Sequence, residues 1–461
     1  MHKPCYFLLV LVLLPLLLSC NRSDDNYTAY FGGEVQNPQT RYVLFSRGNT
    51  VIDTLLLDKN NRFIVKFDSL TPGMYNFKHE PEYQYVYFDK NDSLMVSINA
   101  RDFDQSIVFS GRGEAKNNFM MELALAHEKD RSSGLMSYDK ELSKFLRDID
   151  STYARRKNFY EKSKKTIQWS DGFDFYAKAR VDLNYYTKRE YYPYVHERRT
   201  GRDVRPQLPK DYYDFRKNIN LNNPALSTFS PFMRYYTAML NNRAVENVKD
   251  ASISAENALR DHIAKLDIAN SLFTNEKIRN GVLDNIAFSY LLEDRNIQHN
   301  RTFLKKYLQL STDKSDTNEI HKMGRAIAKL NPGSRLPQIP LVTQNGQSTD
   351  VLAKGTTIVF FWTTVAKVQF EEIYKKVVSL KKKYPALNFI AVNVDSDEQW
   401  KRVVTRYDFS AATQLRATDF ARLREDWVFT KIDRTIVLNP DGTIKNAFAD
   451  LLSPDFESEL K

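Results

Sequence analysis

The pattern of hydrophobic and polar positions changes several times along this 461-residue chain. Between residues 27 and 111, short runs of β-branched and aromatic residues are separated by turn-forming residues at close spacing. Regular short strands with turn signals between them predict an antiparallel β-sandwich. The runs that we interpret as strands are RYVLFSR, VIDTLLLD, RFIVKFDS, GMYNFKHE, YQYVYFDK, DSLMVSINA and SIVFSG.

Between residues 112 and 330, apolar residues recur three and four positions apart, as in NNFMMELALAHEKD and AENALRDHIAKLDIANSLF. This spacing is typical of amphipathic helices. No repeat of fixed length indicates a solenoid. We therefore predict an all-helical middle region.

A tyrosine-rich segment, residues 174–199, lies inside this helical region. Tyrosine rings offer apolar faces with a polar tip, so they could stack on sugars or peptides. Alternatively, they pack against neighbouring helices, as aromatic residues at helical spacing usually do. The tyrosines concerned are Tyr185, Tyr186, Tyr191, Tyr192 and Tyr194.

The last part of the chain, residues 334–461, combines both patterns. A continuous apolar strand at 356–362 precedes a helix at 366–383, and NFIAVNVD forms a second buried strand. A further helix, DEQWKRVVTRY, is followed by a hairpin that turns at Pro440-Asp441-Gly442 and by a terminal helix. This order predicts a mixed α/β domain.

Near the start of the chain, a basic residue, Lys3, precedes an apolar run over residues 6–18. This run is shorter than the ~20 residues of a membrane span, so it fits a secretory signal. The sequence LLSC resembles a bacterial lipobox, which implies cleavage before Cys20 and lipidation of its sulfur. We therefore predict a signal peptide at 1–19 and a lipidated tether at 20–26. The alternative is an ordinary cleaved signal with an incidental cysteine.

The rest of the composition excludes several kinds of site. Cys5 and Cys20 are the only cysteines, so cleavage and lipidation would leave a mature chain without a free thiol. The seven histidines are scattered, and no metal-ligand or cofactor motif occurs, so we expect neither a metal site nor a cofactor. The net charge of +10 comes from interleaved acids and bases. This pattern favours a solvated surface over a nucleic-acid interface.

Several short motifs in the last region occur in an order and spacing that mark a family. On these motifs, residues 334–461 resemble the thioredoxin-like domain of TlpA-type proteins, which are envelope thiol–disulfide oxidoreductases. The resemblance implies a thioredoxin-like fold and a Gram-negative envelope lipoprotein. The matching positions are Pro337, Asn345-Gly346, Lys354-Gly355, Phe361-Trp362, Val394-Asp395 and Asp441-Gly442.

The redox site that the resemblance implies is degenerate in this chain. Where the family has Cys-x-x-Cys, this chain has Ala366 and Gln369, and Asp433 stands where the family has a cis-proline. The chemistry needs a thiolate at a helix N-terminus and a second thiol that resolves the mixed disulfide. Neither alanine nor glutamine can do this. A cis bond before a residue other than proline costs ~2.5–4 kcal/mol, so we expect Ile432–Asp433 to be trans.

These observations predict a membrane-tethered, redox-inactive thioredoxin-like protein that acts as a binding or scaffold module and not as an enzyme. Its partner would be an envelope protein or peptide. We expect it to be lipid-anchored in the cell envelope, at the outer membrane, on the periplasmic or the surface face. The alternative is a thiol–disulfide oxidoreductase of the cell envelope, which is the function that the resemblance alone implies.

Overall fold

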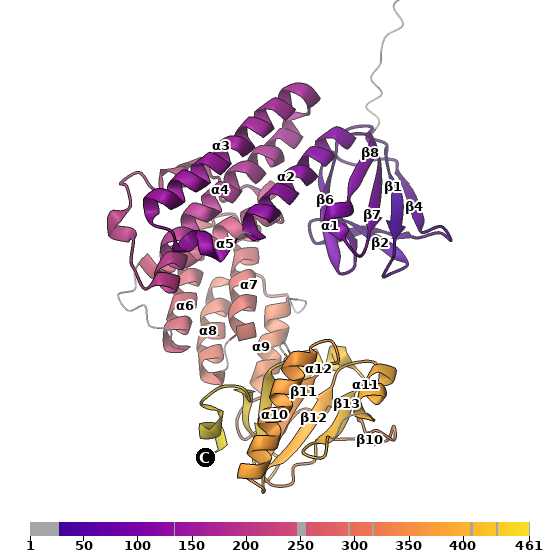
Figure 1. Ribbon diagram of the computed structural model, residues 1–461, viewed down its shortest axis with the longest axis vertical. Helices are drawn as coiled ribbons and strands as arrows, with labels where there is room; N and C mark the ends of the chain where they lie inside the picture. The colour runs from indigo at the N-terminus through magenta and orange to yellow at the C-terminus, as the bar shows by residue number, and fades with distance from the viewer. Residues whose placement is uncertain are drawn as a thin grey trace, which may run out of the picture. The chain divides into compact units, whose positions relative to one another are not determined.

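The computed structural model describes residues 27–132, 134–246, 255–293, 296–315, 318–405, 409–429 and 432–460 (Figure 1). The predicted signal peptide and Cys20 lie outside these residues. The chain divides into two compact units, and the last of the three boundaries along the chain falls within helix α5 (Ser230–Glu246). One unit comprises Met1–Phe215 and Thr228–Ala238, and the other comprises Arg216–Ser227 and Met239–Lys461. Within the described residues, no helix is both long and apolar enough to cross a membrane.

The first unit contains two four-stranded sheets that share one hydrophobic core. Phe31 of one sheet lies 5.4 Å from Phe45 of the other, measured between ring centroids. The strand orders are β4-β1-β7-β8 and β3-β2-β5-β6. The strands are β1 (Ala29–Gln36), β2 (Tyr42–Arg47), β3 (Thr50–Leu56), β4 (Arg62–Phe67), β5 (Gly73–His79), β6 (Glu82–Phe88), β7 (Ser93–Asn99) and β8 (Val108–Arg112).

The sequence had predicted an antiparallel sandwich. The sandwich is instead mixed, because β1 and β7 pair in parallel. Parallel neighbours need a long connection, and the five strands between β1 and β7 supply one. Sequence analysis also missed β1, which contains two glycines that weaken the strand signal. A Cβ atom at Gly33 would lie 2.2 Å from the Val96 backbone oxygen of β7, so this close pairing requires glycine.

Helices follow the sandwich in the first unit. The N-cap Ser170 starts α4, and Gly201, in the left-handed conformation, ends it. In α2, the Lys116 ammonium lies 2.6 Å from Asp92 and 2.8 Å from Asp89, so buried ion pairs tie this helix to the sandwich. The helices are α1 (Phe103–Ser106), α2 (Glu114–Ser132), α3 (Leu142–Ile167) and α4 (Asp171–Thr200), together with the start of α5.

The tyrosine-rich segment forms part of α4, and its rings pack against neighbouring residues. Tyr192 is fully buried and stacks on Phe145 at 4.0 Å between centroids, while its hydroxyl donates to the Lys140 carbonyl. Tyr185 stacks on Tyr153 at 4.3 Å. These contacts favour the packing interpretation over a ligand platform.

In the second unit, four helices that follow α5 precede a seven-stranded sheet with the order β10-β9-β13-β12-β11-β14-β15. The helices before the sheet are α6 (Ala255–Leu272), α7 (Glu276–Glu293), α8 (Ile297–Leu310) and α9 (Glu319–Lys329). The strands are β9 (Leu341–Val342), β10 (Ser348–Thr349), β11 (Thr357–Trp362), β12 (Asn388–Asn393), β13 (Thr413–Ala417), β14 (Arg434–Leu438) and β15 (Ile444–Asp450), with α10 (Lys367–Lys383), α11 (Asp397–Val404) and α12 (Phe420–Asp426) between them.

One interior strand of this sheet is β11, whose six residues are all buried. It runs parallel to β12 and antiparallel to β14. Sequence analysis missed β13 and α12, which are short and carry little apolar periodicity. The expected terminal helix is a 3-10 helix, Phe456–Leu460.

Candidate functional site

Ala366 and Gln369, which the sequence comparison predicts at the two cysteine positions, lie where β11 ends and α10 begins. Ala366 is the N-cap of α10 and offers no side-chain hydrogen bond to the helix, and Gln369 lies half-buried in the first turn. The pairing of Phe360 with Thr435 places Asp433, two residues earlier, at the same end of the sheet. Among the residues that the structure describes, Glu80–Pro81 is the one cis peptide, so the Ile432–Asp433 bond is trans. The structure therefore places Ala366, Gln369 and Asp433 at one end of the sheet.

The loop before α10 is held by a carboxylate, Asp395, which follows β12. The Thr364 backbone N–H donates to Asp395 Oδ2 at 2.7 Å, and the Thr363 hydroxyl donates to Oδ1. The Asn393 amide donates both to Asp395, at 3.0 Å, and to the Trp362 carbonyl, at 3.3 Å. Hydrogen bonds to an ionised acceptor are stronger than neutral ones. Asp395 thus fixes the loop that would carry the redox motif in the family.

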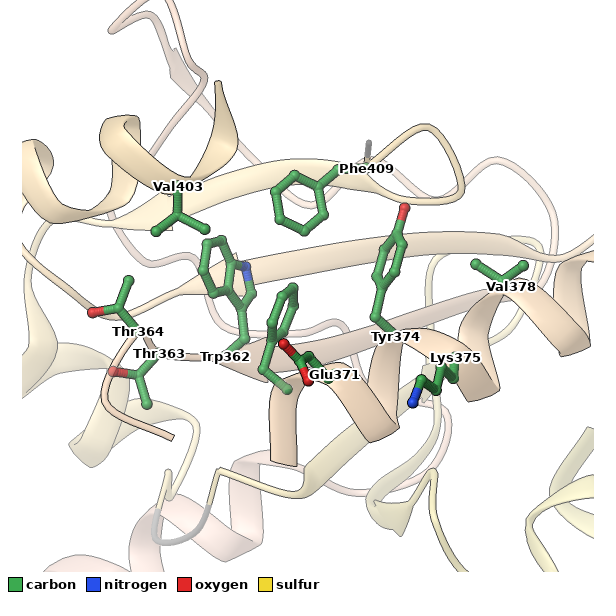
Figure 2. Close-up of a pocket in the computed structure, with 10 residues that line it drawn as sticks. Trp362, Thr363, Thr364, Glu371, Tyr374, Lys375, Val378, Val403 and Phe409 are labelled. Atoms are coloured by element: carbon green, nitrogen blue, oxygen red, sulfur yellow. The ribbon is translucent and has the colours of Figure 1, made fainter. Parts of the chain in front are cut away.

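An apolar cavity of about 400 Å³ lies beside this loop, along one face of α10 (Figure 2). Cavities of this size are typical of small-ligand sites. Its side chains come from β11, the following loop, α10, α11 and the segment before β13. They are Trp362, Thr363, Thr364, Phe370, Glu371, Tyr374, Lys375, Val378, Val403 and Phe409.

Aromatic rings in mutual contact form the wall of this cavity. Trp362 stacks on Phe370 at 4.6 Å between centroids, and Phe409 lies 5.6 Å from Trp362 and 5.3 Å from Tyr374. The Tyr374 hydroxyl accepts a hydrogen bond from the Ala411 backbone N–H, which fixes its ring. The Trp362 indole N–H is buried and has no hydrogen-bond partner in the structure. The wall is therefore rigid and apolar, with one unused donor.

The surface next to the cavity also exposes apolar side chains. Val365 is 86% exposed and Val368 is 73% exposed, and both lie within two residues of Ala366. Single exposed apolar residues are ordinary on protein surfaces. Here two of them extend the apolar surface beside the cavity. Glu371 and Lys375 add one charge of each sign to the cavity lining.

A buried arginine, Arg434, also lies at this end of the sheet. Arg434, directly after Asp433, is 7% exposed, and no carboxylate in the described residues pairs with it. Its guanidinium donates to the Ala447 carbonyl at 2.9 Å and to the Trp427 and Val428 carbonyls, and it lies 4.2 Å from the Phe448 ring centroid. Burial lowers its pKa to about 9. It remains charged at neutral pH and ties the segment after α12 to β15.

Sequence analysis did not identify the aromatic cavity. Its side chains lie on segments that are separated by up to 47 positions, from Trp362 to Phe409, and only the fold brings them together. One local signal was present, because Phe370, Tyr374 and Val378 recur every four residues along α10. That signal alone does not distinguish a cavity wall from a packed core. The described residues contain no group of three metal-ligating side chains.

No protein-family model matches the chain, and no curated protein does. Solved structures resemble parts of it. One is a thioredoxin-like protein from Bacteroides caccae, with 14% identity over 54% of this chain and 90% of its own, at a TM-score of 0.34. A second is the thioredoxin domain of a thiol–disulfide oxidoreductase from Bacteroides vulgatus, with 21% identity over 27% of this chain and 91% of its own, at a TM-score of 0.24.

A third is a thiol:disulfide interchange protein from a Bacteroides species, with 21% identity over 25% of this chain and 80% of its own, at a TM-score of 0.22. All three identities are low, and each likeness extends over only a part of this chain.

Proposed function

We propose that this protein is a membrane-tethered binding module, in which the thioredoxin-like region has lost redox chemistry and retains an apolar binding site. The observation that carries the proposal is the position of the aromatic cavity, directly beside Ala366 and Gln369. The occupant is an apolar side chain, aromatic or large aliphatic, of an envelope protein or peptide. The tether is a lipid on Cys20, which keeps the module at the outer membrane.

The missing thiols support a non-redox role. Residues 21–461 contain no cysteine, and thiol–disulfide exchange requires a thiolate that attacks a disulfide sulfur. Ala366 offers no nucleophile, and Gln369 cannot resolve a mixed disulfide.

The cavity itself favours an apolar side chain as the occupant. An incoming ring can contact Trp362, Phe409 and Tyr374 in offset or edge-to-face geometry, which contributes ~0.5–1.5 kcal/mol per aromatic pair beyond area burial. The exposed Val365 and Val368 extend the apolar contact beyond the cavity. Burial of ~100 Å² of apolar surface contributes ~2.5 kcal/mol. One side chain therefore supplies only part of the binding free energy of a specific interface.

The alternative function is thiol–disulfide exchange, which the names of two of the similar solved structures suggest. In this chain it would have to use Cys5 or Cys20, because there is no other cysteine. Insulin reduction by dithiothreitol separates the two functions. We expect no acceleration by the protein. Acceleration that the Cys20→Ser substitution removes would establish the alternative.

A binding experiment tests the cavity directly. Acetylated phenylalanine amide and acetylated leucine amide are titrated into the full chain, and the Trp362 indole N–H resonance is followed by NMR. We expect a saturable shift. Val378 is 47% exposed and lines the cavity, so Val378→Trp should fill it and abolish the shift.

The matched control is Leu352→Trp, which adds the same ring at a position that is 62% exposed and outside the cavity lining. This variant should bind both amides as the unsubstituted chain does. The proposed site is wrong if neither amide shifts the resonance, or if Val378→Trp binds as well as Leu352→Trp.

A further inference from the structure

A second cavity lies in the first unit, far along the sequence from the thioredoxin-like region. Its volume is about 180 Å³, and its lining is mainly polar. Five elements contribute side chains to it: β6, α1, α2, α4 and the first turns of α5. The residues that carry the inference are Gln84, Tyr85, His127, Arg180, Asn184 and Arg234.

Arg180 is the central feature of this cavity. It is 6% exposed, and its guanidinium carbon lies 5.7 Å from the Tyr85 ring centroid and 5.4 Å from that of Phe229. Its Nε is buried without a hydrogen-bond partner. Among the described residues, no carboxylate lies within ion-pair distance of this guanidinium. Burial lowers the pKa of Arg180 to about 10, so it remains charged at neutral pH.

A second arginine, Arg234, lines the same cavity from α5. Its guanidinium lies 3.5 Å from the Ser230 hydroxyl, and no ion pair with it occurs in the described part of the chain. Burial also lowers its pKa. A desolvated cation without a carboxylate is costly, unless an anion is recruited from outside the chain. Because two such cations line one small cavity, an anion bound between them would offset a larger cost.

The acidic residues of the lining do not neutralise these two arginines. Glu128 pairs with Arg131, and both are about half exposed. The Asp104 carboxylate accepts from the Gln84 amide, and Asp104 and Glu82 are exposed. Exposed charges are screened by water and salt, whereas buried ones are screened much less. The interior of the cavity therefore remains positive.

His127 adds a neutral polar group to the lining of this cavity. Its Nδ1 lies 2.9 Å from the Asn184 amide nitrogen, which donates to it. Burial, followed by the charges of Arg180 and three other cations, lowers the pKa of His127 to about 3. The imidazole is therefore neutral at physiological pH, and its Nε2 carries a proton that it can donate.

We infer that this cavity binds a small oxyanion, a carboxylate or phosphate group, between Arg180 and Arg234. A guanidinium presents parallel N–H donors that match two oxygens of either group. The Gln84 amide lines the cavity and donates one hydrogen to Asp104, so its second N–H can add a neutral donor. The volume suits a free ion or the charged end of a larger molecule whose remainder extends outward.

Calorimetric titration of the full chain with inorganic phosphate and with acetate, at constant ionic strength in chloride, tests this site. We expect saturable binding of at least one anion. Binding of phosphate alone would identify a phosphate-bearing ligand, and binding of acetate alone would identify a carboxylate. Arg180→Met should weaken the binding at least tenfold, which corresponds to about 1.4 kcal/mol.

Arg101→Gln is the control, because it removes one positive charge from an exposed position of the same unit. It should bind the anions as the unsubstituted chain does. If circular dichroism shows that Arg180→Met does not fold, Arg234→Gln tests the same site. The inference is overturned if neither anion binds, or if the variants of Arg180 and Arg234 that fold bind as tightly as Arg101→Gln.

Discussion

Replacement of Asp395 by alanine should loosen the end of the sheet that carries the candidate site. The carboxylate accepts from the Thr364 N–H at 2.7 Å, from the Asn393 amide at 3.0 Å and from the Thr363 hydroxyl. A hydrogen bond to a charged group contributes ~1.5–3 kcal/mol. The site is half-buried, and water can replace part of what is lost. We therefore expect a loss of about 2–3 kcal/mol in the free energy of unfolding, or roughly 30- to 150-fold in the folding equilibrium.

Urea unfolding followed by tryptophan fluorescence measures this loss, because three of the four tryptophans, Trp362, Trp400 and Trp427, lie in residues 334–461. Asp395→Asn keeps one acceptor oxygen and should lose about half as much. The control is Asp455→Ala, at an exposed position, which should change stability by less than ~0.5 kcal/mol. If Asp395→Ala falls within that same range, the carboxylate does not hold the loop.

Three further outcomes are expected. Lys116→Met leaves the carboxylates of Asp89 and Asp92 without their buried cation. It should destabilise the first unit by about 3–5 kcal/mol in urea unfolding, and a change below ~1 kcal/mol would contradict this expectation. Because the folded-state pKa of His127 is depressed to about 3, stability should fall as pH drops from the unfolded pKa of ~6.5 towards that value, and His127→Gln should flatten the slope. Cys20→Ser should move the protein from the membrane fraction to the soluble fraction, and fatty-acid labelling of that variant would refute the lipid anchor.

The assignment of Ala366, Gln369 and Asp433 to redox positions stays a prediction from the sequence, because it depends only on residue identity within the frame of the resemblance. The structure adds that the three residues lie at one end of the sheet. The aromatic cavity could not be predicted from the sequence. The four-residue spacing of Phe370, Tyr374 and Val378 places them on one side of a helix, but the spacing does not say whether another element covers that side.

The sequence by itself determined the elements whose apolar period is strong, such as β11 and α10, because burial on both faces of a strand or on one face of a helix leaves a local pattern. It did not determine β1, where glycines permit close pairing with β7, nor the parallel direction of that pair. Only the tertiary structure brought Arg180 and Arg234 to one cavity, across more than 50 positions of the chain. Partners distant in sequence leave no periodic signal, because their meeting depends on how whole helices and sheets pack.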